Sequence, residues 1–396
     1  MKKIVGYVLL ILLVGGCATP VSPISPQVSS TPPTIEETSV PTLTSQPSVA
    51  PTPTSNLKYV QQCIQIETQD TALKDVTTGT VVQDNVLLDI QAEKKYPLRT
   101  TGSFNSFQVI DRHGLQVSPG RKMFAYIETI QSGQQALWIV NAQAEMLAKI
   151  SFRRNDLETP RWLDNEHLVF YTAQTDIGGS VLVINPFIQE QTTVSNELPI
   201  LDFLGARKST LINWLVEYSP DLNLVIYLDN HGGVSLRDVL TKKTLWNAEY
   251  GGLYGKAVWS PDGQQVAVVA NGQLYVVDRF GQARPILNKM AKLQPTAPSW
   301  SPDGHKVAFW DSVQRLIVYD QQMGRVVDLC IGVPESDVTY PVRWSPDSRQ
   351  LIIEKQISAN PMIVVPQVID LQKSVMYTKI LGGENIRGEV WMNSLP

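Results

Sequence analysis

Three side chains of the kinds that form a serine-hydrolase triad stand within five positions of one another: Ser301, Asp303 and His305. In such a triad, the base and the orienting acid reach the nucleophile from separate segments of the chain. Here all three residues lie in or beside a short phrase that recurs elsewhere without the histidine. Its Ser and Asp side chains can bond to the local backbone. The spacing therefore indicates a structural turn and no catalytic triad.

Other patterns of catalytic and metal-binding residues are also missing from the sequence. It has no G-x-S-x-G nucleophile motif, no calcium-binding loop and no glycine-rich phosphate loop. The four histidines, His113, His167, His231 and His305, lack the H-E-x-x-H spacing of zinc enzymes. We therefore expect no enzymatic activity, no cofactor and no metal site.

Composition narrows the class of protein further. The 396 residues carry 33 basic and 37 acidic side chains, and the net charge of −4 argues against a nucleic acid partner. The hydrophobic share of 43% is enough for a sizeable core. Apart from Cys17, the chain contains Cys63 and Cys330, which are far apart in sequence. They could pair in an oxidising compartment, but two buried thiols are the favoured alternative.

The N-terminus carries the pattern of a secretory signal. Met1-Lys2-Lys3 precedes an apolar run at 4–14, which is too short to span a bilayer comfortably. Val14-Gly15-Gly16-Cys17 resembles a bacterial lipobox, which implies a signal peptide at 1–16 and lipidation of Cys17. The alternatives are an ordinary signal peptide and an uncleaved anchor. Each of them leaves the remaining chain outside the cytoplasm, and by resemblance Ala18 favours the outer membrane in a bacterium with two membranes.

Residues 17–56 form a segment of a different character. Of the 39 residues at 18–56, 25 are Pro, Ser or Thr. Such a segment buries too little apolar surface to fold. We interpret it, with the lipidated Cys17, as a disordered tether that would reach on the order of 100 Å if fully extended at ~3.1 Å per residue. The folded domain is expected at 57–396.

A repeated phrase runs through this domain. It reads Trp-Ser-Pro-Asp-Gly at 259–263 and 300–304 and Trp-Ser-Pro-Asp-Ser at 344–348, with weaker copies at 117–120, 162–165 and 218–221. The position after the aromatic falls at 118, 163, 219, 260, 301 and 345, which gives steps of 45, 56, 41, 41 and 44 residues. Pro and Gly suit a tight turn, and strand-like runs follow each phrase. Repeats of this length with strand content are typical of a propeller with four-stranded antiparallel blades.

These phrases resemble the PD40 or TolB-like class of WD40-related propellers. The resemblance covers residues from about 105 to 380 and implies an all-β propeller, a class that often has six blades. Trp391 recurs in phase at the C-terminus, and 57–100 offer further strands. We therefore favour seven blades over six, with the ring closed by strands from both ends of the chain. The repeated tryptophans are expected in the core between blades.

Loops that interrupt the repeat are the candidates for recognition, because loops carry binding residues on a rigid scaffold. One excursion contains Asp202, Phe203, Arg207 and Lys208, and another contains Glu335, Asp337 and Tyr340. An ordinary connection between blades remains the favoured interpretation of each loop taken singly.

The sequence predicts a lipoprotein of the cell envelope whose propeller is a protein-binding or scaffolding module. A protein partner is implied by the resemblance to TolB-like propellers in envelope complexes. The alternative is a propeller hydrolase or lyase that acts on carbohydrate or peptide in the central channel. Clustered acidic or His side chains at one mouth of the channel would favour the enzyme, whereas an apolar or mixed loop face would favour the binding module.

Overall fold

The structure is a computed structural model. It describes residues 58–59, 64–83, 86–99, 116–129, 134–153, 161–171, 181–194, 216–229, 233–249, 257–270, 272–287, 298–311, 315–332, 342–359, 362–378 and 386–393. Within these ranges one short 3-10 helix occurs, η1 (Leu73–Asp75), and no helix is long and apolar enough to cross a membrane.

The described strands form seven sheets, which we number as blades in chain order. Blade 1 contains β30 (Ile386–Met392), β3 (Thr80–Gln83), β4 (Val86–Asp89) and β5 (Lys94–Pro97). Blade 2 contains β6 (Gln116–Val117), β7 (Met123–Thr129), β8 (Gln134–Asn141) and β9 (Met146–Arg153). Blade 3 contains β10 (Arg161–Trp162), β11 (Leu168–Tyr171), β12 (Val181–Asn185) and β13 (Glu190–Val194).

The later blades follow the same plan. Blade 4 contains β14 (Glu217–Tyr218), β15 (Leu224–Leu228), β16 (Gly233–Asp238) and β17 (Thr244–Glu249). Blade 5 contains β18 (Ala257–Trp259), β19 (Gln265–Ala270), β20 (Gln273–Asp278) and β21 (Ala283–Leu287). Blade 6 contains β22 (Ser299–Trp300), β23 (Lys306–Trp310), β24 (Arg315–Asp320) and β25 (Arg325–Gly332). Blade 7 contains β26 (Arg343–Trp344), β27 (Gln350–Ala359), β28 (Met362–Asp370) and β29 (Val375–Tyr377).

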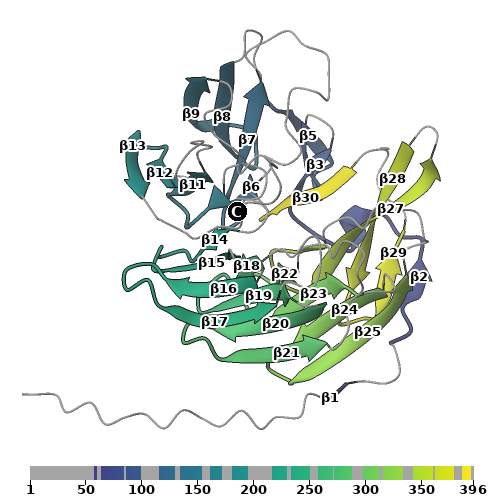
Figure 1. Ribbon diagram of the computed structural model, residues 1–396. Helices are drawn as coiled ribbons and strands as arrows, with labels where there is room; N and C mark the ends of the chain where they lie inside the picture. The colour runs from purple at the N-terminus through teal and green to yellow at the C-terminus, as the bar shows by residue number, and fades with distance from the viewer. Residues whose placement is uncertain are drawn as a thin grey trace, which may run out of the picture. The chain divides into compact units, whose positions relative to one another are not determined.

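The blades follow one another in a ring, with the first strand of each blade innermost (Figure 1). Contacts link β14 to β18, β18 to β22, β22 to β26 and β26 to β30, and β30 and β10 both contact β6. Blades 3 and 4 meet where the guanidinium of Arg161 donates to the Val216 carbonyl at 3.5 Å. The predicted seven-bladed propeller is therefore confirmed, and the six-bladed alternative is excluded.

The turn between the first and second strands of a blade, the inner turn, has the structure that the repeated phrase predicts. In blade 6 the buried Ser301 Oγ donates to Asp303 Oδ1 at 2.5 Å and accepts the Lys306 N–H at 2.9 Å. The Asp303 carboxylate accepts the His305 N–H at 3.0 Å. The same Ser–Asp bond recurs at 219–221, 260–262 and 345–347. These bonds satisfy the backbone where each second strand begins.

The core lies between adjacent blades, and the repeated tryptophans are part of it. Trp300, Trp344 and Trp391 are 6%, 0% and 1% exposed, as predicted, whereas Trp259 is only partly buried. The indole N–H groups of Trp300 and Trp344 tie neighbouring inner strands together. Trp300 Nε1 donates to the Val258 carbonyl at 2.9 Å and Trp344 Nε1 to the Ser299 carbonyl at 2.9 Å. The tryptophan of one blade thus also holds the inner strand of the blade before it.

A second repeated element, which the sequence analysis missed, shapes the turn between the third and fourth strands, here called the outer turn. An Asp or Asn at the end of the third strand accepts backbone N–H groups of the turn in all seven blades. These residues are Asp89, Asn141, Asn185, Asp238, Asp278, Asp320 and Asp370. Asp and Asn favour such turns because their short side chains mimic a backbone acceptor.

Inner and outer turns lie on the same face of the propeller, because the strands of each blade alternate in direction. The two turns are also bonded to each other. The N–H of Gln321, in the outer turn of blade 6, donates to the His305 carbonyl of the inner turn at 2.9 Å. We call this surface the turn face.

The ring closes between the two ends of the chain, as predicted. β30 pairs antiparallel with β3, with Met392 opposite Thr80 and Trp391 opposite Val81. Trp391 packs in the core cluster shared with blade 7, and Met392 packs in the cluster shared with blade 2. The C-terminal strand therefore belongs to the hydrophobic core on both of its sides.

The segment before blade 1 departs from the prediction. Strands β1 (Lys58–Tyr59) and β2 (Glu67–Gln69) pair parallel with the outer edges of blades 6 and 7, on β25 and β29. These blades therefore have five strands, and their outer edges are covered. We call the described residues 58–59 and 64–69 the strap. Cys330, on β25, is exposed and disulfide-bonded, so the expectation of a buried thiol at this position is wrong. Cys63 lies outside the described residues.

Candidate functional site

The residues predicted as candidates for lipidation or recognition lie outside the described residues. They are Cys17, Asp202, Phe203, Arg207, Lys208, Glu335, Asp337 and Tyr340. Their predicted roles stay predictions.

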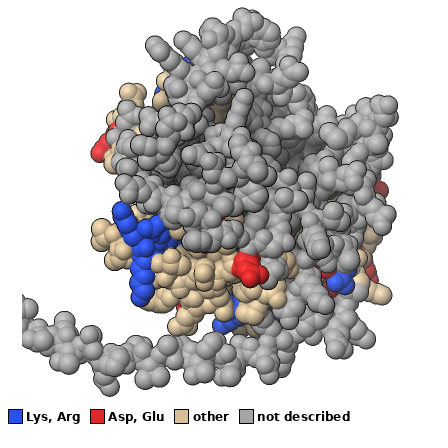
Figure 2. All heavy atoms as spheres, viewed as in Figure 1, with Lys and Arg blue, Asp and Glu red and all other residues tan. Residues whose placement is uncertain are grey.

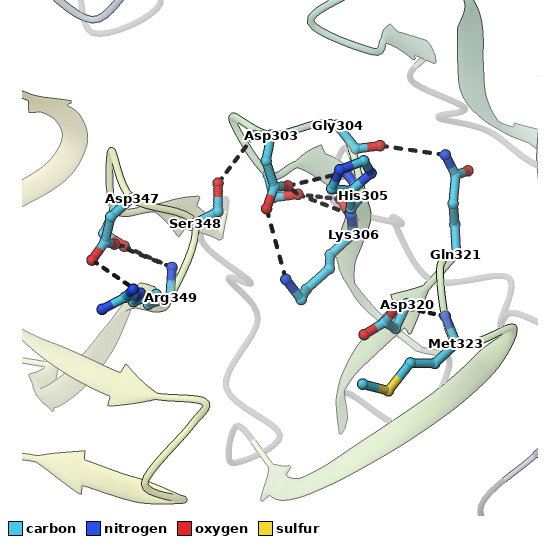
Figure 3. A network of polar contacts seen from close by, with 12 residues as sticks. Asp303, Gly304, His305, Lys306, Asp320, Gln321, Met323, Asp347, Ser348 and Arg349 are labelled. Atoms are coloured by element: carbon cyan, nitrogen blue, oxygen red, sulfur yellow. Dashed lines mark hydrogen bonds and ion pairs between the residues drawn. The ribbon is translucent and has the colours of Figure 1, made fainter.

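The triad-like group of blade 6 is built into its turn. The side-chain hydrogen bonds of Ser301 lie within the inner turn, to Asp303 and to the Lys306 backbone. The N–H of Asp303 connects the turn to the next blade, because it donates to Ser348 Oγ at 3.0 Å (Figure 3). His305 contributes its backbone N–H and carbonyl to the two turns of its own blade. These contacts are structural, which agrees with the interpretation of the phrase as a turn. Elsewhere in the described ranges, no group of three or more His, Cys, Asp or Glu side chains could hold a metal ion.

The turn face carries an arc of exposed apolar side chains. Within the described residues seven large hydrophobic side chains are exposed, and all of them lie in or beside outer turns. Five consecutive blades contribute: Met146 and Leu147 in blade 2, Phe187 and Ile188 in blade 3, Leu240 in blade 4, Phe280 in blade 5 and Met323 in blade 6. We call these seven residues the apolar arc. A single exposed apolar residue needs no explanation, but the same placement on successive blades indicates a surface that contacts something.

Two of these side chains project almost fully into solvent. Leu240 is 89% exposed and Phe280 is 82% exposed. Each follows the capping aspartate of its turn by two positions, so the turn bonds fix where it points. At the equivalent position blade 3 has Phe187, whereas blades 1, 2, 6 and 7 have the polar Gln91, Gln143, Gln322 and Gln372. Among the described residues the outer turns of blades 7 and 1 have no exposed large hydrophobic side chain, so the apolar arc spans blades 2 to 6.

Basic side chains flank the apolar arc in blade 4. Arg237, Lys242 and Lys243 lie in or beside the outer turn of blade 4. Figure 2 shows Lys and Arg side chains gathered at one end of the sheet β14–β17. Leu240 lies between them in sequence. A partner for this part of the surface would need an apolar pocket next to acidic or polar groups.

A hollow of about 960 Å³ lies beside the apolar arc, next to blade 1. Thr78, Lys122, Leu147, Asp347 and Asn393 are among its lining residues. Blade 1 has no inner turn, because its first and second strands come from opposite ends of the chain. The hollow opens at this position, and Leu147 belongs to both the hollow and the apolar arc.

The ring also encloses a central channel of about 410 Å³. In the later blades, the residue that precedes the aromatic of the inner strand lines this channel. Arg161, Glu217, Val258, Ser299 and Arg343 hold that position in blades 3 to 7. These channel-lining residues could have been predicted from the sequence, because aligning the repeated phrases shows which residue precedes each aromatic. Arg161 forms an ion pair with Glu217.

Arg121 reaches the same channel from the inner turn of blade 2. Its Nη1 donates to the carbonyl of Trp344 at 2.8 Å and to that of Trp391 at 2.9 Å. Burial, with a smaller contribution from the positive charge of Arg343, lowers the pKa of Arg121 to about 10. The side chain is still charged at neutral pH.

A polar joint on the turn face connects blades 4 and 5. Arg279 donates to Asp221 Oδ2 at 2.6 Å and to the Gly263 carbonyl at 3.1 Å. Burial alone would raise the pKa of Asp221, but hydrogen bonds from Ser219, Arg279 and Asn223 outweigh it and lower the pKa to about 2. The outer turn that presents Phe280 is thus held by an ionised aspartate of the preceding blade.

Comparison with known proteins gives no family. No family model matches the chain, and no curated protein matches it. Among solved structures it is similar to Hsv2 of Kluyveromyces lactis with complete loop 6CD, at 12% identity and a TM-score of 0.44 over 65% of this chain and 72% of that one. It is also similar to the same protein with loop 6CD replaced by a Gly-Ser linker, at 12% identity and a TM-score of 0.42 over 81% of this chain and 98% of that one. These likenesses are too distant to say anything about function.

Proposed function

We propose that this protein is a lipoprotein of the cell envelope whose propeller is a protein-binding module, with the turn face as its docking surface. The observation that carries the proposal is the apolar arc on five consecutive blades. Leaving a Leu or Phe side chain in water forgoes roughly 1.5–3 kcal/mol of burial for each residue. A partner that covers the apolar arc would recover part of this free energy.

The central channel offers less support for the enzyme alternative. Among its described lining residues Glu217 is the one carboxylate, and it is engaged by Arg161. Acid–base cleavage of a glycosidic bond uses a pair of carboxyl groups that flank the bond. The described residues of the lining also include no histidine. A binding role is therefore favoured over a hydrolase or lyase.

The location in the cell envelope is supported by the signal-like N-terminus, by the lipobox resemblance at Cys17 and by the disulfide at Cys330. Disulfides persist in oxidising compartments outside the cytoplasm. Labelling with a fatty-acid analogue tests the anchor, and we expect incorporation into the wild type and none into Cys17→Ser. Equal labelling of both would contradict lipidation at this residue.

Site-specific photocrosslinking in the native membrane tests the docking surface. A photoreactive phenylalanine analogue at position 280 should capture a protein partner, because this side chain protrudes from the apolar arc. The matched control carries the same analogue at Gln91, which occupies the equivalent position in the outer turn of blade 1. Capture at 280 should decrease when Leu240→Ser is introduced in the neighbouring blade.

The outcome separates the possible occupants of the surface. A protein adduct that is specific for position 280 supports the docking surface. Equal capture at 91 and 280 would contradict it. Adducts that contain only lipid would show that the turn face meets a membrane, and the proposal of a protein partner would then fail.

A further inference from the structure

Cys330 has a backbone conformation that is unusual for a residue within a strand. Its φ is 56°, whereas the other described non-glycine residues with positive φ lie between strands. A bulge accompanies this conformation, because residues 329–331 of β25 lie opposite the single residue Leu316 of β24. Positive φ strains a residue with a side chain, and such strain is often found at switch regions. Cys330 is also exposed and disulfide-bonded.

The hydrogen bonds around Cys330 connect it to the strap. The N–H of Ile64 donates to the Asp328 carbonyl at 2.9 Å, and the N–H of Cys330 donates to Asp328 Oδ1 at 2.8 Å. The chain has two other cysteines, Cys17 and Cys63, and Cys63 directly precedes Ile64. Because consecutive Cα atoms are 3.8 Å apart, Cys63 is the expected partner of Cys330.

Few other interactions hold the strap on the propeller. β1 pairs with β25 over two residues, and β2 pairs with β29 over three residues, all of them exposed on β2. Ile64 and Ile66 are partly buried against the core cluster between blades 6 and 7. A segment with few buried apolar contacts and exposed backbone bonds opens at a low free energy. The attachment of the strap should therefore depend strongly on the disulfide.

We propose that the disulfide of Cys330 is a redox-sensitive switch, whose reduction releases the strap from the outer edges of blades 6 and 7. Exposed or strained disulfides are reduced more easily than buried structural ones. A thiol of the reductant attacks the Sγ atom of Cys330, forms a mixed disulfide and releases Cys63 as a thiolate. A second thiol of the reductant resolves the mixed disulfide. Two electrons and two protons thus pass to this protein, and the reductant becomes a disulfide.

Release of the strap changes the surface of the propeller at its outer edge. β25 has eight residues, and its outer backbone groups lose their partner when β1 leaves. An uncovered edge strand of this length can pair with another chain. The reduced protein therefore offers an edge that the oxidised protein covers. This edge is separate from the turn face, so the switch does not depend on the proposed docking surface.

Amide hydrogen exchange of the full chain in detergent tests the switch. The protein is compared before and after treatment with a glutathione buffer without denaturant, since typical structural disulfides resist this reductant. We expect exchange of the amides at 64–69 and 325–332 to become about tenfold faster or more, because the strap opens. Exchange in β19 of blade 5 should stay the same. A disulfide that glutathione reduces only after denaturant is added would overturn the proposal, and so would unchanged exchange after reduction.

Variants identify the cysteines that form the switch. Cys63→Ser and Cys330→Ser should exchange at the rate of the reduced wild type in both buffers. Cys17→Ser is the matched control, because it also removes one cysteine and should keep the response to glutathione. If Cys330→Ser does not fold, Cys63→Ser provides the test, since it leaves β25 unchanged. A response that is retained in Cys63→Ser and lost in Cys17→Ser would refute the assignment.

Discussion

The Ser and Asp of the inner turns in blades 4 to 7 show how a catalytic-looking pattern can be purely structural. Ser301 is fully buried, and its hydroxyl both donates to Asp303 and accepts the Lys306 N–H. A hydroxyl engaged in this way holds the start of a strand. The sequence could predict this role because the same phrase recurs without the histidine. It could not predict the role of Arg121, because that depends on backbone carbonyls more than 200 positions away.

Individual aspartates on the turn face contribute to the stability of the folded protein, and this contribution depends on pH. Hydrogen bonds lower the pKa of Asp221 to about 2, against the opposing effect of burial. Asp303 and Asp164 also have lowered pKa values for the same reasons. Below its ordinary pKa of about 4 an unfolded aspartate takes up a proton that the folded one resists. The stabilisation is therefore present above pH 4 and is lost as the pH falls towards 2.

We predict that the melting midpoint of Asp221→Asn changes less between pH 4 and pH 2 than the melting midpoint of the wild type. The melting midpoint of the wild type should fall between pH 4 and pH 2, and the difference between wild type and variant should shrink over the same interval. Asp262→Asn is a suitable comparison, because this aspartate holds the equivalent turn position in blade 5 and has no ion pair with Arg279. A constant difference between wild type and Asp221→Asn from pH 6 to pH 2 would contradict the role of Asp221.

The repeated tryptophan is the residue on which blade packing depends most. We predict that Trp300→Ala lowers stability by roughly 3–5 kcal/mol through lost burial and a cavity. Trp300→Phe should cost less, because it keeps the ring and loses mainly the bond to the Val258 carbonyl. Chemical denaturation measures both. A Trp300→Ala protein as stable as the wild type would show that the indole does not belong to the core.

At the scale of strands and turns, the four-stranded blades followed from the repeat, whereas the strap did not. The phrases and the alternating apolar runs predict hairpins because their signals are local. β1 and β2 have only two and three residues, and they pair with strands more than 260 and 300 positions away. Such short parallel pairings leave no pattern in the sequence. The outer turns were predictable only in part. Their Asp or Asn is a local signal, but it recurs at variable spacing along the chain.

The strap gives the disulfide of Cys330 a definite expected partner. Tyr59 pairs with Val326, and the N–H of Ile64 donates to the Asp328 carbonyl at 2.9 Å. The described residues on both sides of Cys63 therefore lie along β25, two to four positions before Cys330. We predict a Cys63–Cys330 bond, which peptide mapping without reduction would detect.

Removing this bond should loosen the outer edge of blade 6 and leave the ring closed. Cys63→Ser is expected to lower the melting midpoint by a few degrees under oxidising conditions, on the order of the 2–4 kcal/mol typical of a structural disulfide. Adding a reductant should bring the wild type to the same midpoint. A mapped bond between Cys330 and Cys17, or a disulfide-linked dimer, would contradict the pairing.

At the scale of the whole molecule, the ring depends on a strand from the last residues of the chain. β30 supplies Trp391 and Met392 to two different core clusters. Asn393 adds bonds to the next blade, from its backbone N–H to the Arg121 carbonyl at 2.9 Å and from its side chain to the Gly120 carbonyl at 3.1 Å. The number of blades could be predicted because Trp391 recurs in phase with the repeat. The apolar arc could not, because exposure depends on which turns the ring leaves uncovered.

We predict that a chain stopped at Arg387 is insoluble or markedly less stable, whereas removal of Leu395 and Pro396 alone is harmless. The longer truncation removes Trp391 and Met392, which are 1% and 0% exposed, and opens the cores on both sides of blade 1. It also exposes the edge of β3, and an unpaired edge strand promotes aggregation. Thermal melts of the two truncations, with soluble yield as a second measure, provide the test. If the chain stopped at Arg387 melts at the temperature of the full chain, β30 does not close the ring.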